Sequence, residues 1–260
     1  MSALRIEGIT VQFGGVVALS NVWISVPAGQ IYALIGPNGA GKTTLFNVIA
    51  GVYAANQGEV FLFDKKIDGM TPADLAVRGL TRTFQNLQIF FRMTAVENVM
   101  VGRHIHERRN ALVDLMGWPV VRRQNRVTRE TAMTLLERVG LARLAEKPAG
   151  DLSYGALKRL EIARALAAEP RVLMLDEPVA GCNASESAEV AAVIRQIAAT
   201  GVTVVLVEHD MSLVMSLADR IHVLERGKTL AEGTPTEIRS HAAVVEAYLG
   251  IPKGADNAGS

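Results

Sequence analysis

The chain has 260 residues, of which 49% are hydrophobic, and its 27 basic and 26 acidic residues give a formal net charge of +1. This length and apolar content can build a large buried core without covalent staples. The near-neutral balance argues against nucleic acid as an obligatory partner. The single cysteine, Cys182, excludes an internal disulfide and favours a reducing compartment such as the cytoplasm.

The first third of the chain predicts strands, because β-branched residues are frequent at 4–11 and 22–26 and turn residues separate the two runs. We expect these strands to form an N-terminal antiparallel β subdomain. The continuous apolar run at 31–35 predicts a strand buried on both faces. A glycine-rich loop and a helix follow it.

Helical periodicity dominates from about 92 to 168, which predicts a helical subdomain inserted into the sheet domain. Two more buried strands are expected at 172–175 and 202–207, with a helix between them. Because strands alternate with helices, we predict an α/β fold with a mostly parallel core sheet. The expected organisation is a single domain over 1–250, followed by a short polar, flexible tail at 251–260.

The segment 36–43, GPNGAGKT, matches the phosphate-loop pattern GxxxxGK[ST] between the predicted strand and helix. Glycines leave successive N–H groups free to surround a phosphate, and the helix N-terminus adds its positive end. Lys42 is expected to contact the β- and γ-phosphates of ATP, and the Thr43 hydroxyl to bind Mg²⁺. The alternative, an ordinary glycine-rich turn, is disfavoured by this context. The predicted nucleotide contacts in this segment are Asn38, Gly39, Ala40, Gly41, Lys42, Thr43 and Thr44.

Two carboxylates, Asp176 and Glu177, directly follow the predicted strand at 172–175. The carboxyl edge of a parallel sheet is where α/β proteins bind ligands. We predict that Asp176 holds Mg²⁺ through water and that Glu177 polarises the attacking water. Acids also end strands simply because they are solvated, and the phosphate loop favours the functional interpretation.

The segment 152–156, LSYGA, followed by KRLEIAR at 158–164, resembles the signature motif of ABC ATPases. The resemblance extends from Phe13 to about residue 250 and identifies the chain as a P-loop NTPase of this family. It implies that Phe13 stacks on adenine, that Gln85 senses Mg²⁺ and the membrane subunit, and that His209 is the switch histidine. Gln85 is therefore expected to be a metal ligand, and Gln85 and His209 to assist Glu177 in catalysis.

Ser153 is predicted to cap the helix that follows it, and Gly155 allows close approach to a backbone N–H. In ABC ATPases the anion at this position is the γ-phosphate bound to the opposite subunit, so the resemblance implies a dimer. The motif departs from the usual LSGGQ, since Tyr154 and Ala156 replace a glycine and a glutamine. Asn183 likewise stands where many relatives carry an aspartate.

The stretches 82–98 and 232–238 resemble one subgroup, the branched-chain amino-acid type of importer ATPase. This resemblance implies a homodimer or a heterodimer with a second ABC ATPase, two transmembrane permease subunits, and a periplasmic or surface solute-binding protein. The chain would lie peripherally on the cytoplasmic face of the inner membrane and power uptake of branched-chain amino acids or a related small polar or amphipathic solute. A soluble ABC ATPase, such as an iron–sulfur assembly ATPase, is the alternative; the signature disfavours a P-loop kinase.

Charge is concentrated between Arg103 and Arg129, where seven arginines accompany two acids. Charged runs usually form a solvated face. The alternative hypothesis is that these arginines help hold the subunit at a membrane complex, because anionic lipid attracts them.

Overall fold

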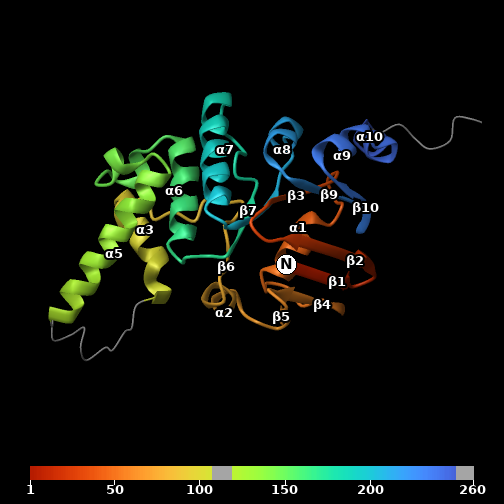
Figure 1. Ribbon diagram of the computed structural model, residues 1–260, viewed down its shortest axis with the longest axis horizontal. Helices are drawn as coiled ribbons and strands as arrows, with labels where there is room; N and C mark the ends of the chain where they lie inside the picture. The colour runs from red at the N-terminus through yellow and green to blue at the C-terminus, as the bar shows by residue number, and fades with distance from the viewer. Residues whose placement is uncertain (107–118, 250–260) are drawn as a thin grey trace, which may run out of the picture. The chain divides into compact units, whose positions relative to one another are not determined.

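The structure, a computed structural model, describes residues 1–106 and 119–249 (Figure 1). The chain divides into two compact units. Unit 1 comprises Met1–Gly69 and the chain from Val205 onward, and unit 2 comprises Met70–Val204. No helix among the described residues is both long enough and apolar enough to span a lipid bilayer.

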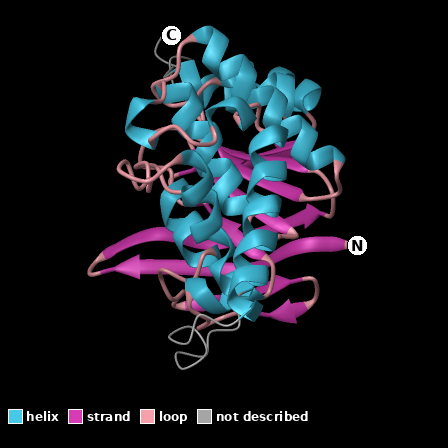
Figure 2. Ribbon diagram, turned by 90° about the vertical axis from the view of Figure 1, so that its left-hand side faces the viewer, coloured by secondary structure: helices cyan, strands magenta, loops and turns pink. Residues whose placement is uncertain are grey.

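Unit 1 contains the predicted antiparallel sheet, whose strands follow the order β2-β1-β4-β5 (Figure 1). The strands of the protein are drawn in magenta in Figure 2. Its strands are β1 (Ser2–Phe13), β2 (Val16–Pro27), β4 (Gln57–Leu62) and β5 (Lys65–Lys66). The first two are longer than predicted, because pairing between β1 and β2 continues to the turn, from Ser2↔Pro27 to Phe13↔Val16. The alternating apolar residues of β1, such as Leu4 and Ile6, are buried.

The rest of unit 1 is built on a buried strand, β3 (Ile31–Ile35), all of whose residues are buried. It pairs in parallel with β9 (Arg220–Glu225), which pairs antiparallel with β10 (Lys228–Gly233). The helices of this unit are α1 (Lys42–Ile49), α8 (Met211–Leu217), α9 (Pro235–Ser240) and α10 (Ala242–Leu249). The chain reaches α1 directly from β3 through the glycine-rich loop, as the sequence predicts.

Unit 2 contains a second parallel pair, β6 (Leu80–Arg82) and β7 (Val172–Asp176), in which Arg82 is the register partner of Met174. All five residues of β7 are buried. Strand β8 (Thr203–Val207) crosses from unit 2 into unit 1. The parallel pairs β3–β9 and β6–β7 agree with the predicted, mostly parallel core sheet.

Helices occupy the described chain between β6 and β7, in the stretch where the sequence predicts a helical subdomain. Helix α3 contacts both α5 and α6, and α6 contacts α7, so these helices form a layer within unit 2 (Figure 1). Among the described residues of unit 2, the helical elements are α2 (Pro72–Val77), α3 (Ala95–Gly102), η1 (Arg103–His106), α5 (Pro119–Arg138), η2 (Ala142–Leu144), η3 (Ala149–Asp151), α6 (Tyr154–Leu166) and α7 (Ala184–Ala199).

Candidate nucleotide site

The phosphate loop joins β3 to α1, and two of its glycines are required by close approach to neighbouring backbone. Gly36 has φ 153°, and a Cβ there would lie 2.2 Å from the carbonyl oxygen of Leu224. Gly41 has φ 100°, and its Cβ would lie 2.8 Å from the carbonyl oxygen of Ala18. Any larger residue at these positions would displace the loop.

The loop presents positive charge at the start of α1. The Lys42 side chain is buried, and its Nζ donates hydrogen bonds to the carbonyl oxygens of Gly36 (2.7 Å) and Pro37 (3.0 Å). The N-cap residue of α1, Gly41, offers no side-chain acceptor, and the first turn contains no acid. The first-turn N–H groups and an ammonium group therefore suit an anion such as a phosphate.

The remaining loop residues divide into supports and exposed groups. Ala40 is buried, its N–H donates to Pro37, and its carbonyl oxygen accepts from Gly227. Asn38, Gly39 and Thr43 are exposed, and Thr44 is half-buried. The predicted ligand-facing hydroxyl, that of Thr43, is thus accessible at the first turn of α1.

Phe13, the predicted adenine contact, lies at the end of β1 with 48% of its surface exposed. Its ring meets the ring of Tyr53 edge to face, with centroids 5.5 Å apart and an interplanar angle of 74°. Tyr53 is also exposed. Sequence reasoning did not identify Tyr53, although its aromatic type and its place two residues after Gly51 were available as signals.

The predicted switch histidine, His209, lies between β8 and α8 and is exposed. Its backbone N–H donates to the buried carboxylate of Glu208 at 3.0 Å. Asp210 caps α8 by accepting a hydrogen bond from the Leu213 N–H at 3.1 Å. Two acids thus fix the backbone around His209, and Glu208 was not predicted from the sequence.

In unit 2, Asp176 ends β7 and is buried. Its Oδ2 accepts a hydrogen bond from the Arg82 guanidinium at 2.7 Å, and its N–H donates to the Thr83 hydroxyl at 3.3 Å. Both partners come from β6 or the residue after it. This ion pair could not be identified from the sequence, since its members are 94 positions apart.

Glu177 has a backbone conformation that few non-glycine residues adopt, with φ 48°. Its Oε2 accepts a hydrogen bond from the side-chain amide of Gln85 at 3.1 Å. The buried Lys158 ammonium donates to its carbonyl oxygen at 3.4 Å. The structure therefore brings together two predicted catalytic residues, Gln85 and Glu177, at the end of β7.

The signature segment begins α6. Ser153 is its N-cap, and the Ser153 hydroxyl accepts a hydrogen bond from the Ala156 N–H at 3.3 Å, as the sequence predicts. The N–H of Gly155 donates to Oε1 of Glu186 at 3.0 Å. Asn183 caps α7 by accepting from the Glu186 N–H at 3.0 Å. Sequence reasoning missed Glu186.

Hydrogen bonds from the N–H groups of Gly155 and Asn183 hold the pKa of Glu186 below its usual range. A smaller contribution comes from the Ser153 side chain, and Arg159 adds a favourable charge. Glu186 is therefore an ionised carboxylate at neutral pH, and it accepts a hydrogen bond from the Gly155 N–H of the signature segment.

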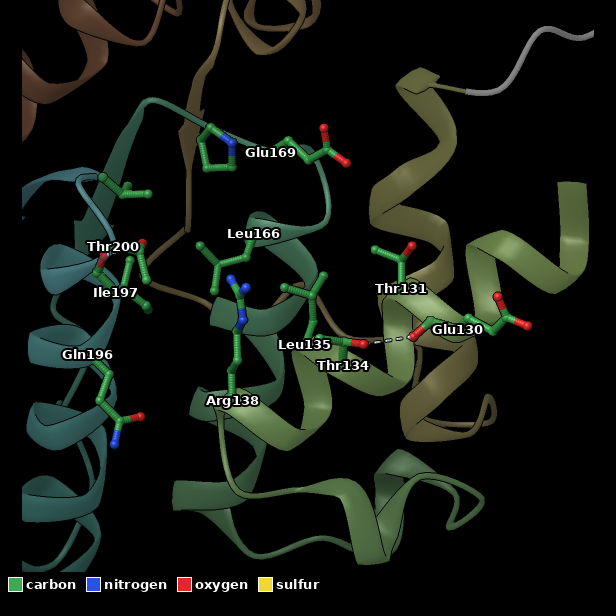
Figure 3. A pocket seen from close by; sticks show the side chains of 12 residues that line it. Glu130, Thr131, Thr134, Leu135, Arg138, Leu166, Glu169, Gln196, Ile197 and Thr200 are labelled. Atoms are coloured by element: carbon green, nitrogen blue, oxygen red, sulfur yellow. Dashed lines mark hydrogen bonds between the residues drawn. The ribbon is translucent and has the colours of Figure 1, made fainter.

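A pocket of about 680 Å³ lies elsewhere in unit 2, among α5 and the C-terminal ends of α6 and α7 (Figure 3). Apolar side chains such as Leu135 and Ile197 line it together with charged ones such as Arg138 and Glu169. None of the residues predicted to bind nucleotide lines this pocket. It is therefore not the candidate nucleotide site.

The basic segment is only partly described. Arg108 and Arg109 lie outside the described residues, as does the side chain of Arg122. Three of the other arginines form ion pairs, which are Arg103 with Glu169, Arg126 with Glu130, and Arg129 with Glu146. Part of the charge is thus balanced within unit 2, as expected for a solvated face.

The sequence matches two family models. Residues 19–180 match the model described as ABC transporter, and residues 228–252 match the model described as branched-chain amino acid ATP-binding cassette transporter. The first match contains the phosphate loop, the signature segment and the acidic pair. The second lies in the C-terminal part of unit 1.

Curated relatives are similar over nearly the whole chain. The high-affinity branched-chain amino acid transport ATP-binding protein BraF of Pseudomonas aeruginosa is 45% identical over 95% of this chain and 97% of its own. The corresponding protein LivG of Escherichia coli (strain K12) is 41% identical over the same shares of the two chains.

A solved structure described as the ADP conformation of an ATP-binding cassette of an ABC transporter superposes with a TM-score of 0.84. It is 35% identical and covers 96% of this chain and 99% of its own. A nucleotide-free ATP-binding cassette from an ABC transporter gives a TM-score of 0.83 at 35% identity, covering 95% of this chain and 99% of its own. The predicted α/β fold of the P-loop NTPase class is confirmed.

Proposed function

Because the chain belongs to the ABC transporter family, and within it to the branched-chain amino-acid type of ATP-binding cassette, we propose that it hydrolyses ATP to power an importer. The solute is a branched-chain amino acid or a related small polar or amphipathic molecule. The observation that carries the proposal is the phosphate loop. Its backbone leaves no room for a Cβ at Gly36 or Gly41, and its Lys42 is the first residue of a helix without a side-chain N-cap.

The nucleotide contacts follow from the chemistry of the loop. Backbone N–H groups of residues 38–44 bind the β-phosphate, and the Lys42 ammonium binds the β- and γ-phosphates once its hydrogen bonds to loop carbonyls are exchanged for charged partners. Phe13 stacks on the adenine, with Tyr53 packed against the edge of its ring.

A hard divalent cation such as Mg²⁺ prefers oxygen ligands, and the hydroxyl of Thr43, the amide of Gln85 and the carboxylate of Asp176 are such ligands. In our proposal Thr43 and Gln85 bind it directly and Asp176 through water. When bound, the cation neutralises charge on the phosphates.

Glu177 is proposed to orient and polarise the water that attacks the γ-phosphate. The Gln85 amide restrains its carboxylate at 3.1 Å, and the left-handed backbone at Glu177 fixes the direction in which the side chain leaves the strand. His209 is proposed to contact the γ-phosphate, its backbone held by Glu208.

We further propose that Ser153 and Gly155 contact nucleotide bound to a second ATPase, either a copy of this chain or a related subunit. Two transmembrane permease subunits and a periplasmic or surface solute-binding protein complete the importer, which places this chain peripherally on the cytoplasmic face of the inner membrane. The exposed rings of Phe84, Phe90 and Phe91, which lie within six positions of Gln85 in the sequence, support a protein partner at this segment.

The direct experiment is affinity purification of the chain from membranes, with identification of the copurifying subunits and a ligand panel for the associated binding protein. We expect two permease subunits and a binding protein that prefers aliphatic amino acids. Recovery without any membrane-spanning subunit would contradict the importer function and favour a soluble ABC ATPase.

A further inference from the structure

The carboxylate of Glu186 accepts hydrogen bonds from Gly155 and Ser153, the two residues that the proposed function assigns to contact with a phosphate. Glu186 lies in the first turn of α7, and α7 contacts α6. Its Oε1 accepts the Gly155 N–H at 3.0 Å, and its Oε2 accepts the Asn183 N–H at 3.2 Å. One carboxylate therefore joins the start of the signature helix to the start of the next helix.

Gly155 is shaped for this contact. A Cβ at residue 155 would lie 2.6 Å from Cγ of Glu186 and 2.7 Å from its Cβ. Only glycine allows the carboxylate to approach the N–H so closely. An ionised carboxylate at a helix N-terminus also interacts favourably with the positive end of the helix, as a phosphate would.

We propose that Glu186 is an internal stand-in for the γ-phosphate and that its carboxylate must leave the signature donors before the partner's nucleotide can bind them. The inference rests on the proposed function, in which Ser153 and Gly155 contact the nucleotide of a second subunit. Glu186 thereby sets the ATP concentration at which two subunits close on each other.

The capping box of α7 can keep one hydrogen bond to the Glu186 carboxylate after that carboxylate leaves Gly155. Asn183 and Glu186 cap each other, since the Asn183 side chain accepts the Glu186 N–H and the Glu186 carboxylate accepts the Asn183 N–H. A rotation that releases Gly155 can retain this second bond. The exchange then requires a local side-chain movement and no unfolding of α7.

A purely structural role predicts the opposite effect on dimerisation. If Glu186 only braces the signature segment, removing its charge loosens the segment and weakens binding of the partner's nucleotide. If it competes with that nucleotide, removing the charge deletes both a competing acceptor and a repulsion toward the γ-phosphate. The direction of the change therefore separates the two roles.

The test uses the full-length chain in a Glu177→Gln background that blocks hydrolysis, paired with the ATPase subunit that copurifies with it or, where none does, with itself. Analytical ultracentrifugation gives the ATP concentration for half-maximal dimer with Glu186 intact, with Glu186→Gln and with Glu186→Ala. Glu189→Gln is the matched control, because Glu189 lies one turn further along α7 and pairs with Arg159 at 2.9 Å.

We expect Glu186→Gln and Glu186→Ala to lower that ATP concentration about fivefold, with Glu189→Gln unchanged and ATP affinity of the single subunit unaltered. If the parent dimerises with ATP but the Glu186 variants need as much ATP or more, the stand-in role is wrong and the proposed function stands. If neither parent nor variants dimerise at saturating ATP, the two-subunit site is wrong and the stand-in role falls with it.

Discussion

The charged side chains of the phosphate loop and of the acidic cluster at the end of β7, Asp176 and Glu177, find their hydrogen-bond partners in different ways. In the loop, Lys42 donates to carbonyl oxygens only five and six positions away. In the cluster, Asp176 and Glu177 take partners from β6 and the residues after it, 94 and 92 positions away. The charge of Lys42 is therefore balanced within the loop itself, whereas the charges of the cluster are balanced through the packing of unit 2.

This difference predicts different consequences of mutation. Changes to the charged side chain of the loop should alter nucleotide affinity with little effect on folding. Changes in the cluster should alter turnover or the stability of unit 2, because its members hold each other in place. The following predictions test this contrast, from the largest expected effect to the smallest.

Glu177→Gln should reduce ATP turnover about 1,000-fold, because an amide cannot polarise the attacking water. ATP affinity should remain within about twofold of the parent, since the loop is unchanged. Turnover in the assembled complex and calorimetric ATP titration are the measurements, with Glu189→Gln as the control. Turnover close to that of the parent would exclude the catalytic role of Glu177.

Arg82→Gln should lower the free energy of unfolding by about 3 kcal/mol, because it leaves a buried carboxylate without its partner. The side chains of Arg82 and Asp176 are 9% and 6% exposed. Adding Asp176→Asn should recover much of the loss, as a double-mutant cycle in urea unfolding would show. A loss below about 0.5 kcal/mol would place this pair among weak surface pairs.

Lys42→Ala should weaken ATP binding about 10- to 100-fold, because a charged hydrogen bond to phosphate is lost. Stability should change little, as the ammonium donates to carbonyl oxygens of its own loop. Lys66→Ala is a matched control, since Lys66 is exposed and pairs with Glu59 and Asp68. Unchanged ATP affinity would contradict the assignment of the loop.

Substituting Arg108, Arg109, Arg122 and Arg123 by Gln should reduce association with anionic membranes about two- to tenfold, an effect that salt suppresses. The expectation is modest because three neighbouring arginines already have acidic partners. Cosedimentation with vesicles at low and moderate salt is the measurement. Equal association of parent and variant at both would favour the solvated face.

The same contrast explains how much the sequence could predict. The phosphate loop is contiguous, so its motif predicted both its residues and its place between β3 and α1. Arg82 and Glu186 could not be found in this way, because their roles depend on the β6–β7 register and on contact between α6 and α7. The helix cap at Ser153 was predictable, while the carboxylate that reaches Gly155 was not.

The ends of the predicted strands were accurate only where the apolar pattern of the strand itself extends to its ends. The strand predicted at 4–11 extends over Ser2–Phe13, because pairing with β2 continues where the apolar pattern stops. The buried runs of β3 and β7 were located almost to the residue, since both faces of each strand are covered and the apolar run is uninterrupted.

The central claim, that this chain carries two separable halves of nucleotide sites, is tested most directly by ATP titration of Ser153→Glu in parallel with Lys42→Ala. In the isolated subunit, Ser153→Glu should keep nearly normal ATP affinity while ATP-driven dimerisation fails, because its added charge opposes the partner's γ-phosphate. Lys42→Ala should lose affinity in the isolated subunit. If Ser153→Glu loses ATP binding as severely as Lys42→Ala, the two-half arrangement is wrong.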